Sequence, residues 1–318
     1  MNFFGPGEVA GNASGIGKAK STLSIGKLLI LGILAGAYIG FGANLATVVG
    51  HDAPKYLGNG VGQLLFGAVF STGLMLVVIG GAELFTGNNM FMMIGALNGQ
   101  NTWGSLIKNW IIVWIANFIG SLLLVYIMAG GFYGFFDAAP AVGLFKGAVG
   151  AKALAVAKGK LELTWAGAFC RAILCNWLVC MAVWLALASK DVAGKIFGIF
   201  FPIMAFVASG FEHSVANMFF VPMGLVVSQI PAVLDVAAQS TLSAAQLADP
   251  AAAATAVAAF KTTVGNLFTW GNFIMKNLIP VTLGNIVGGA IFVASLYWYS
   301  YLKKAPAAPV APDKSAKA

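Results

Sequence analysis

The chain has 318 residues, of which 59% are hydrophobic and only 9% are charged. Soluble domains carry about 25% charged residues, and the mean hydropathy here is +0.88, so composition excludes a soluble globular fold and indicates an integral membrane protein. The net charge of +8 comes without a basic run interleaved with aromatics. The absence of such a run argues against a nucleic-acid partner. Membrane topology and attraction of anions explain the positive charge better.

Cysteine usage and the N-terminal segment narrow the class further. Cys170, Cys175 and Cys180 are evenly spaced in one apolar segment, and their spacing fits neither a zinc site nor a disulfide framework. We interpret them as small packing residues and expect no metal and no cofactor. Residues 1–25 lack the apolar core of a signal peptide, and we expect a polar, flexible cytoplasmic segment containing a short amphipathic piece at the membrane interface.

Six apolar segments follow, each long enough to cross a bilayer, which takes about 20 helical residues. They are separated by polar connections, of which 131–161 carries four lysines and 229–268 is unusually long with an Ala-rich middle that we expect to be helical. The predicted spans are 27–49, 61–98, 103–130, 164–188, 196–228 and 271–302.

The second and fifth segments are too long for one simple span, and each has an interruption. Gly permits non-helical backbone and Asn is a poor helix former, and both occur in the stretch GGAELFTGNN at 80–89. The fifth segment is interrupted by SGFEHS at 209–214. Irregular backbone at membrane depth survives only where it is buried in protein or lines a cavity. We therefore predict broken helices, with breaks at 82–87 and 209–214.

Two sequence patterns recur in the same order in each half of the chain. Gly-x-Glu-x4-Asn begins at Gly81 and again at Gly210. Lys-Asn-x7-Asn-x2-Gly begins at Lys108 and again at Lys276. A repeated unit of three spans enters the membrane from the opposite side, which is an inverted repeat with its broken helices at the repeat interface. We predict one transmembrane domain, 26–302, with repeats 26–130 and 162–302.

The topology follows from the number of spans and from the lysines. Six spans place both termini on one side, and the positive-inside rule makes that side cytoplasmic. The tail at 303–318 is expected to be disordered. The four lysines of the 131–161 connection fall on the outer side, where we interpret them as an attractor of anions. The lysines on the predicted cytoplasmic side are Lys18, Lys20, Lys27, Lys190, Lys195, Lys303 and Lys304.

Glu212 and His213 stand side by side inside an apolar run. A charge at mid-membrane costs about 2.5–3.5 kcal/mol on insertion scales, so these residues need partners or a water-filled cavity. From this stretch alone, a polar functional site and a pair that staples two helices are equally open. In the repeat, Glu83 mirrors Glu212, whereas Leu84 stands opposite His213. The acids therefore belong to a shared scaffold, and the histidine is the added element at which we expect the chemistry of permeation.

Four stretches resemble the formate/nitrite transporter family: GAELFTG at 81–87, CNWLVC at 175–180, GFEHSVANM at 210–218 and NLIPVTLGN at 277–285. The resemblance covers about residues 20–302. It implies an all-α, aquaporin-like protomer of six helices in a homopentamer of the inner membrane, with one pore per protomer. It also implies a small monovalent anion as substrate. The 277–285 stretch is most similar to the formate branch, and nitrite and hydrosulfide are the alternatives.

The same resemblance implies roles for individual residues. His213 matches the central pore histidine, Thr86 faces it, and Lys160 matches a basic residue near the outer mouth. The apolar constriction matches Phe70, Leu74 and Phe206. Asn176 and Asn272 match further polar residues of the pore, the second less closely.

For the scaffold residues we favour structural roles argued from the residues themselves. Glu83 and Glu212 would accept helix-end N–H groups and orient the loops. Asn88 and Asn217 would cap the half-helices.

The predicted mechanism combines these residues. A bare anion should not cross an apolar ring, and His213 can lend a proton near neutral pH, so a weak-acid anion would cross as the neutral acid. Passage as an anion beside a charged imidazole is the alternative. A water or glycerol channel should show paired Asn-Pro-Ala signatures, which are absent. An enzyme would need a nucleophile or metal ligands near His213, where only Ser214 is available, so we expect a transporter.

Overall fold

The computed structural model describes residues 3–137 and 141–303, and in these ranges the regular elements are helices, apart from one isolated bridge between Phe3 and Ser189. From Trp270 to Tyr301 the helix is continuous and alternates between α and π geometry. The helices are α1 (Pro6–Ser21), α2 (Ile25–Val49), α3 (Ala53–Gly80), α4 (Phe85–Leu97), α5 (Trp103–Tyr133), α6 (Ala148–Leu161), α7 (Trp165–Ala188), α8 (Val192–Ala208), α9 (Ser214–Val227), α10 (Pro231–Ser240), α11 (Ala244–Ala248), α12 (Pro250–Leu267), α13 (Trp270–Asn272), α14 (Ile279–Ile286) and α15 (Leu296–Tyr301).

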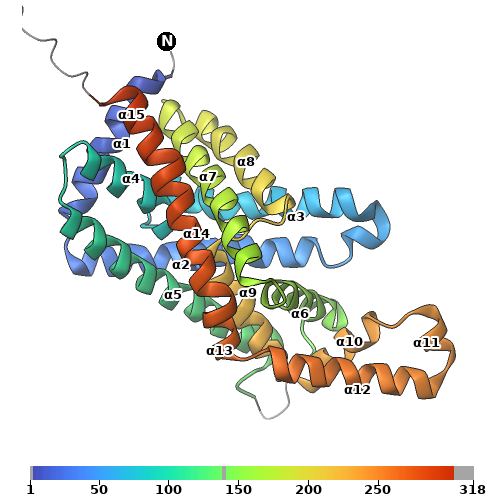
Figure 1. Ribbon diagram of the computed structural model, residues 1–318. Helices are drawn as coiled ribbons and strands as arrows, with labels where there is room; N and C mark the ends of the chain where they lie inside the picture. Colours follow the sequence, from blue (N-terminus) through green and yellow to red (C-terminus); the bar gives the residue numbers. More distant parts are fainter. Residues whose placement is uncertain (1–2, 138–140, 304–318) are drawn as a thin grey trace, which may run out of the picture.

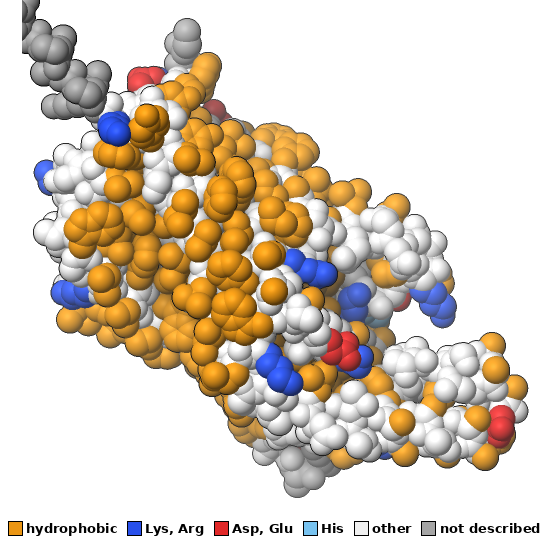
Figure 2. Space-filling view, viewed as in Figure 1, with side chains coloured by type: hydrophobic (Ala, Val, Ile, Leu, Met, Phe, Trp, Pro, Cys, Tyr) orange, Lys and Arg blue, Asp and Glu red, His pale blue; other side chains and the backbone are white. Residues whose placement is uncertain are grey.

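Five of the described helices are long and apolar enough to cross a bilayer: α2, α3, α5, α7 and the continuous helix from Trp270 to Tyr301. The helices α9 and α10 form a pair bent by 105°, and the number of spans rises to six if this pair is counted as one span. The predicted fifth segment is divided between α8, a shorter apolar helix of 17 residues, and α9. Orange side chains cover much of the face formed by α5 and α14 in Figure 2, as expected for a surface in contact with lipid.

The two predicted breaks are present, each after a glycine in the left-handed backbone region. Gly81 ends α3 with φ +84°, and Gly210 follows α8 with φ +70°. Beyond them the Ala82 N–H donates to Val77 O at 2.9 Å, and the Phe211 N–H donates to Phe206 O at 3.1 Å. Such turns satisfy carbonyls at a helix C-terminus. Because only glycine adopts this backbone without strain, the Gly of the repeated pattern fixes where each helix stops.

Glycines of the second pattern bring helices into direct contact. A Cβ on Gly120 of α5 would overlap the Ile33 carbonyl of α2, and one on Gly288 would overlap the Ile173 carbonyl of α7. The two contacts occupy equivalent positions in the two repeats. Small residues permit this close approach of membrane helices. The α2–α5 pair of the first repeat is therefore matched by the pair formed by α7 and the last long helix (Figure 1).

The expectation of a flexible start is wrong for Pro6–Ser21, which forms α1. Its Val9, Ala10 and Ala13 are buried. A Cβ on Gly17 would overlap the Phe91 carbonyl of α4, so α1 packs tightly on a half-helix. The polar connection at 131–161 likewise contains a helix, α6, whose Ala157 and Leu161 are buried. The predicted disordered tail lies outside the described residues from 304 onward.

The long connection before the last span forms an arm of α10, α11 and α12 that projects from the bundle (Figure 1). Lys261 of α12 pairs with Asp235 of α10 at 2.5 Å. The expected helical middle is thus confirmed, and the arm extends on the side of the bundle that holds α6.

Candidate permeation site

The two half-helices α4 and α9 begin at the same point in the centre of the protein. Thr86, in the first turn of α4, places its Oγ1 3.0 Å from Nε2 of His213, the residue immediately before α9. Both side chains are buried, at 0% and 3% exposure. A helix N-terminus carries a partial positive charge. Two such termini therefore meet at Thr86 and His213, an arrangement suited to an anion.

His213 also caps the helix that it precedes. Its Nδ1 accepts a hydrogen bond from the Ala216 N–H at 3.0 Å. Because Nδ1 acts as the acceptor, a neutral ring must carry its hydrogen on Nε2, an assignment that follows from the hydrogen-bond pattern. The Nε2–H then points at Thr86 Oγ1. The cap fixes both the tautomer and the direction of the donor.

Glu212 is the centre of a buried polar cluster. Its Oε1 accepts from Lys160 Nζ at 2.9 Å, and its Oε2 accepts from Asn217 Nδ2 at 2.6 Å and from Asn277 Nδ2 at 3.2 Å. Lys160 and Glu212 have side-chain exposures of only 14% and 5%. Charge-assisted bonds of this kind compensate for removing the carboxylate from water.

The first repeat contains the same cluster built on Glu83. Its Oε1 accepts from Lys20 Nζ at 2.5 Å, and its Oε2 accepts from Asn88 Nδ2 at 2.8 Å. Asn88 Nδ2 also donates to Asn109 Oδ1 at 3.0 Å, just as Asn217 donates to its counterpart Asn277 at 2.7 Å. The repeated asparagines Asn88 and Asn109, and Asn217 and Asn277, therefore help to hold a carboxylate beside each break.

The prediction that Asn88 and Asn217 cap the half-helices is wrong. The N-cap positions are Leu84 and His213, and both asparagines direct their amides to the carboxylates instead. The local Glu-x4-Asn spacing suits either role, and only the arrangement of the neighbouring helix decides between them.

A further pair of asparagines clamps the two breaks. Asn285 Oδ1 accepts from the Ser214 N–H at 2.8 Å, while its Nδ2 donates to Glu212 O at 3.0 Å and to Ala172 O at 2.9 Å. Asn117 makes the equivalent three bonds in the first repeat, to the Phe85 N–H, Glu83 O and Gly32 O at 2.8 to 2.9 Å. These bonds satisfy backbone groups that the broken helices leave unpaired.

Two cavities approach this centre. The first, of about 270 Å³, is lined by α6 and by the break before α9, and includes Lys160, Glu212 and His213. The second, of about 220 Å³, is lined by α1 and by the break before α4, and includes Lys20, Glu83 and Leu84. We call them the α6 vestibule and the α1 vestibule, after helices that lie toward different ends of the bundle (Figure 1).

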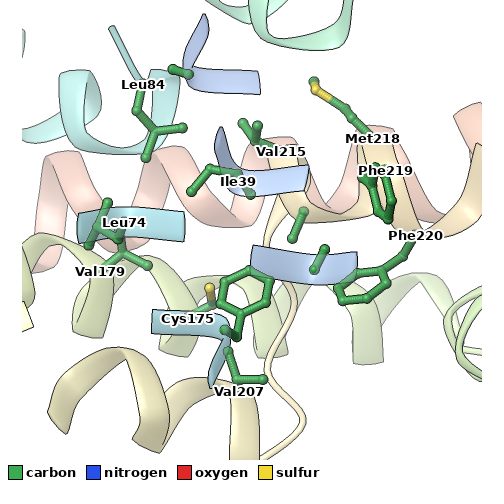
Figure 3. Packing of buried hydrophobic residues seen from close by; sticks show 14 of the residues in the cluster. Ile39, Leu74, Leu84, Cys175, Val179, Val207, Val215, Met218, Phe219 and Phe220 are labelled. Carbon is green, nitrogen blue, oxygen red and sulfur yellow. The ribbon is translucent and has the colours of Figure 1, made fainter. Parts of the chain in front are cut away.

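The predicted constriction residues line these vestibules. Phe70 and Phe206 line the α6 vestibule and meet edge to face with ring centroids 5.8 Å apart. Phe206 also stacks on the His213 ring at 5.9 Å. Leu74 lines the α1 vestibule. Figure 3 shows Leu74 and Val179 within the packed apolar centre of the protein.

Two predicted pore residues are engaged in other contacts. Asn176 is fully buried, and its Nδ2 donates to Thr86 O, Asn89 Oδ1 and Asn285 O. It supports the backbone of the site rather than lining either vestibule. Asn272 is not brought to the site, since its Nδ2 donates to Asn266 O and Leu267 O at 3.1 and 3.0 Å and closes the turn after the arm.

Lys20 is a residue of this site that the sequence did not predict, because its segment is expected to be flexible. The offset from Lys20 to Lys160 is the same as the offset from the Ile33-Leu34 pair to Ile173-Leu174. Each lysine also lies over an equivalent aromatic ring, Lys20 over Phe91 at 5.6 Å and Lys160 over Phe220 at 5.3 Å. The shared offset was the signal available in the sequence.

A family model described as formate/nitrite transporter matches residues 7–299. The chain belongs to the formate/nitrite transporter family. It is 46% identical over 310 residues to a probable formate transporter of Methanothermobacter thermautotrophicus, with coverage of 95% of this chain and 99% of that protein. It is 36% identical to the formate channel FocA of Escherichia coli K12, with coverage of 94% and 95%.

Solved structures show the same architecture. A pentameric formate channel with formate bound superposes with a TM-score of 0.69 at 36% identity, covering 88% of this chain and 98% of that one. An FNT family ion channel gives 0.69 at 27% identity, covering 93% and 98%. The similar proteins are channels and transporters, not enzymes, so this member of the family is a multi-pass membrane protein of the aquaporin-like, inverted-repeat type.

Proposed function

We propose that the protein carries formate across the membrane, through a pore that runs from one vestibule to the other past His213 and Thr86. The observation that carries the proposal is the 3.0 Å contact between Thr86 Oγ1 and His213 Nε2, at the point where the two half-helix N-termini meet. A small carboxylate that separates these two groups gains two hydrogen-bond donors and two helix dipoles. The formate channels and transporters similar in sequence and structure support formate as the substrate.

Because the residues on either side of His213 are apolar, formate would cross them only after it has taken up a proton. Phe70 and Phe206 on one side and Leu74 on the other give an anion nothing to replace its hydration. A neutral acid avoids that cost. We propose that His213 takes up a proton from the vestibule through which formate enters, gives it to the bound anion and returns to the neutral ring, so that formic acid crosses and releases the proton with formate on the other side.

The cap sets the cost of this step. A proton on Nδ1 of His213 would face the Ala216 N–H and break the bond between them. Losing a cap costs about 0.5–2 kcal/mol. An anion beside Nε2 favours the charged ring and offsets that cost. The imidazolium is therefore expected only while the anion is bound.

Substitution of the histidine tests the relay in proteoliposomes that contain a pH-sensitive dye. Asparagine at position 213 keeps a capping oxygen but cannot take up a proton near neutral pH. We expect His213→Asn to abolish the internal acidification that accompanies formate uptake. His51→Asn is the matched control, because His51 contacts Val48 O and Asp52 and lines neither vestibule.

The outcomes separate the alternatives. Proton movement and pH dependence that survive His213→Asn would disprove the relay and favour passage as an anion. Wild-type vesicles no more permeable to formate than protein-free vesicles would disprove the transport function itself. Parallel measurements with nitrite and hydrosulfide identify the preferred substrate within the family.

Assembly and orientation complete the proposal. We infer a homopentamer in the inner membrane, with both termini and the α1 vestibule facing the cytoplasm. A stripe of exposed apolar side chains on α5 supports burial against lipid or a neighbouring protomer: Ile107, Ile111, Ile115, Ile119 and Leu123. The similar solved structure is pentameric. Native mass spectrometry of the detergent-solubilised protein tests the stoichiometry, and accessibility of a cysteine introduced in the α10–α12 arm tests the orientation.

A further inference from the structure

The α6 vestibule contains three cationic side chains against one carboxylate. Two of the cations already have partners. Lys160 pairs with Glu212 at 2.9 Å, and Arg171 donates to Gly210 O at 3.4 Å. The third, Lys152 of α6, also lines the cavity, and its ammonium lies 5.7 Å from the centre of the Phe66 ring. Within the described part of the chain, no carboxylate lies within 4.0 Å of it.

The α1 vestibule lacks this excess of positive charge. At the offset that relates Lys20 to Lys160, the position of Lys152 corresponds to Asn12, and that of Arg171 corresponds to Leu31. The α1 vestibule is lined by one lysine, Lys20, and its partner carboxylate. The repeats are thus alike in their buried ion pairs and differ in the additional cations of the α6 side.

Lys152 stands at one end of a wall of aromatic rings that leads to the constriction. Phe66, beneath its ammonium, stacks on Phe220 with centroids 6.0 Å apart, and Phe220 stacks on Phe70 at 6.2 Å. Phe70 in turn meets Phe206. An anion beside Lys152 therefore lies at the start of the surface that ends at the constriction.

We propose that Lys152 is the anion-capture residue of the α6 vestibule, which binds a small monovalent oxyanion before it reaches His213. The field of Lys160 is largely offset by the carboxylate 2.9 Å away, whereas that of Lys152 is not. An uncompensated cation in a cavity with low-dielectric walls raises the local concentration of an anion by about 10-fold or more. Lys160 is then a fixed part of the scaffold. This inference rests on the proposed transport of formate.

The test is the concentration dependence of formate flux in membrane vesicles of known orientation. Lys152→Met retains the aliphatic stem and removes the charge. We expect it to raise the half-saturating formate concentration about fivefold from the α6 side, to leave the maximal flux unchanged, and to remove most of the inhibition of flux by added inert salt at low formate. Lys152→Arg should restore all three properties, because it keeps the charge.

Lys158→Met is the matched control on the same helix. Lys158 lies outside the α6 vestibule and pairs with Glu162 at 2.6 Å, so its removal should leave the half-saturating concentration unchanged. The proposal is overturned if Lys152→Met behaves as wild type, or if Lys158→Met gives the same loss, which would indicate only the general surface potential. Absence of formate flux in the wild type would instead contradict the proposed function. Removal of an uncompensated, half-buried charge should not impair folding.

Discussion

The clamp formed by Asn285 allows a quantitative prediction. Replacing it with leucine retains roughly its volume and removes three hydrogen bonds. The Ala172 carbonyl keeps the backbone bond of its helix, but the Ser214 N–H and the Glu212 carbonyl lose the partner that satisfies them. Each buried backbone group left unsatisfied costs about 1–3 kcal/mol. We therefore expect Asn285→Leu to destabilise the protein by about 2–6 kcal/mol.

The assay is thermal unfolding of the detergent-solubilised protein, followed by tryptophan fluorescence. With about 2–4 °C per kcal/mol for larger domains, the midpoint should fall by at least about 4 °C. Formate flux should fall as well, because the residue before Ser214 is His213, the proposed pore histidine. The pseudo-symmetry adds a second expectation, that Asn117→Leu lowers the midpoint by a similar amount, since it removes the same three bonds in the first repeat.

Asn272→Leu is the control, because it makes the same replacement of asparagine by leucine at a position outside the clamp. Its amide bonds lie partly exposed at the end of the arm, where water can replace them, so the midpoint should change little. A midpoint for Asn285→Leu within about 1 °C of wild type would refute the reasoning, because the clamp would then contribute no net hydrogen-bond energy. Unequal effects of the two clamp substitutions would refute their equivalence.

Three further predictions concern the breaks and the vestibule. Gly210→Ala forces a left-handed backbone on alanine, so it should lower the stability by about 1–2 kcal/mol. Gly265→Ala is the control: it lies in an open position of α12, and it should raise the stability slightly in the same thermal assay. Lys160→Met leaves the buried Glu212 carboxylate without its cation and should lower the free energy of unfolding by about 3–5 kcal/mol. In a double-mutant cycle, adding Glu212→Gln to Lys160→Met should recover a large part of that loss. Burial lowers the pKa of Lys152, and its charge is present below that pKa and lost as the pH rises through it. The half-saturating formate concentration should therefore rise at alkaline pH in the wild type but not in Lys152→Arg. If the two proteins behave alike, the pH effect belongs to another group. The other charged or titratable groups of that vestibule are Lys160, Arg171, Glu212 and His213.

Much of the architecture was contained in the sequence. Apolar segments of bilayer length, Gly-rich interruptions and the recurrence of two patterns at constant offsets are properties of a chain that must satisfy its backbone inside a membrane. They predicted the helical class, the inverted repeat and the position of both breaks within a few residues. Because the acid recurs in both halves and the histidine in only one, the sequence also separated the scaffold from the added group.

The tertiary structure decided which partner each polar side chain takes. Asn217 could cap its own helix or bond the preceding acid, and the answer depends on Asn277, 60 residues away. Asn176 resembled a pore residue, yet its amide is used by three acceptors from the helices around it. Lys20 pairs with an acid 63 residues further along the chain. A hydrogen bond depends on distance and direction in space, and for residues so far apart in sequence, only the packing of the helices sets them.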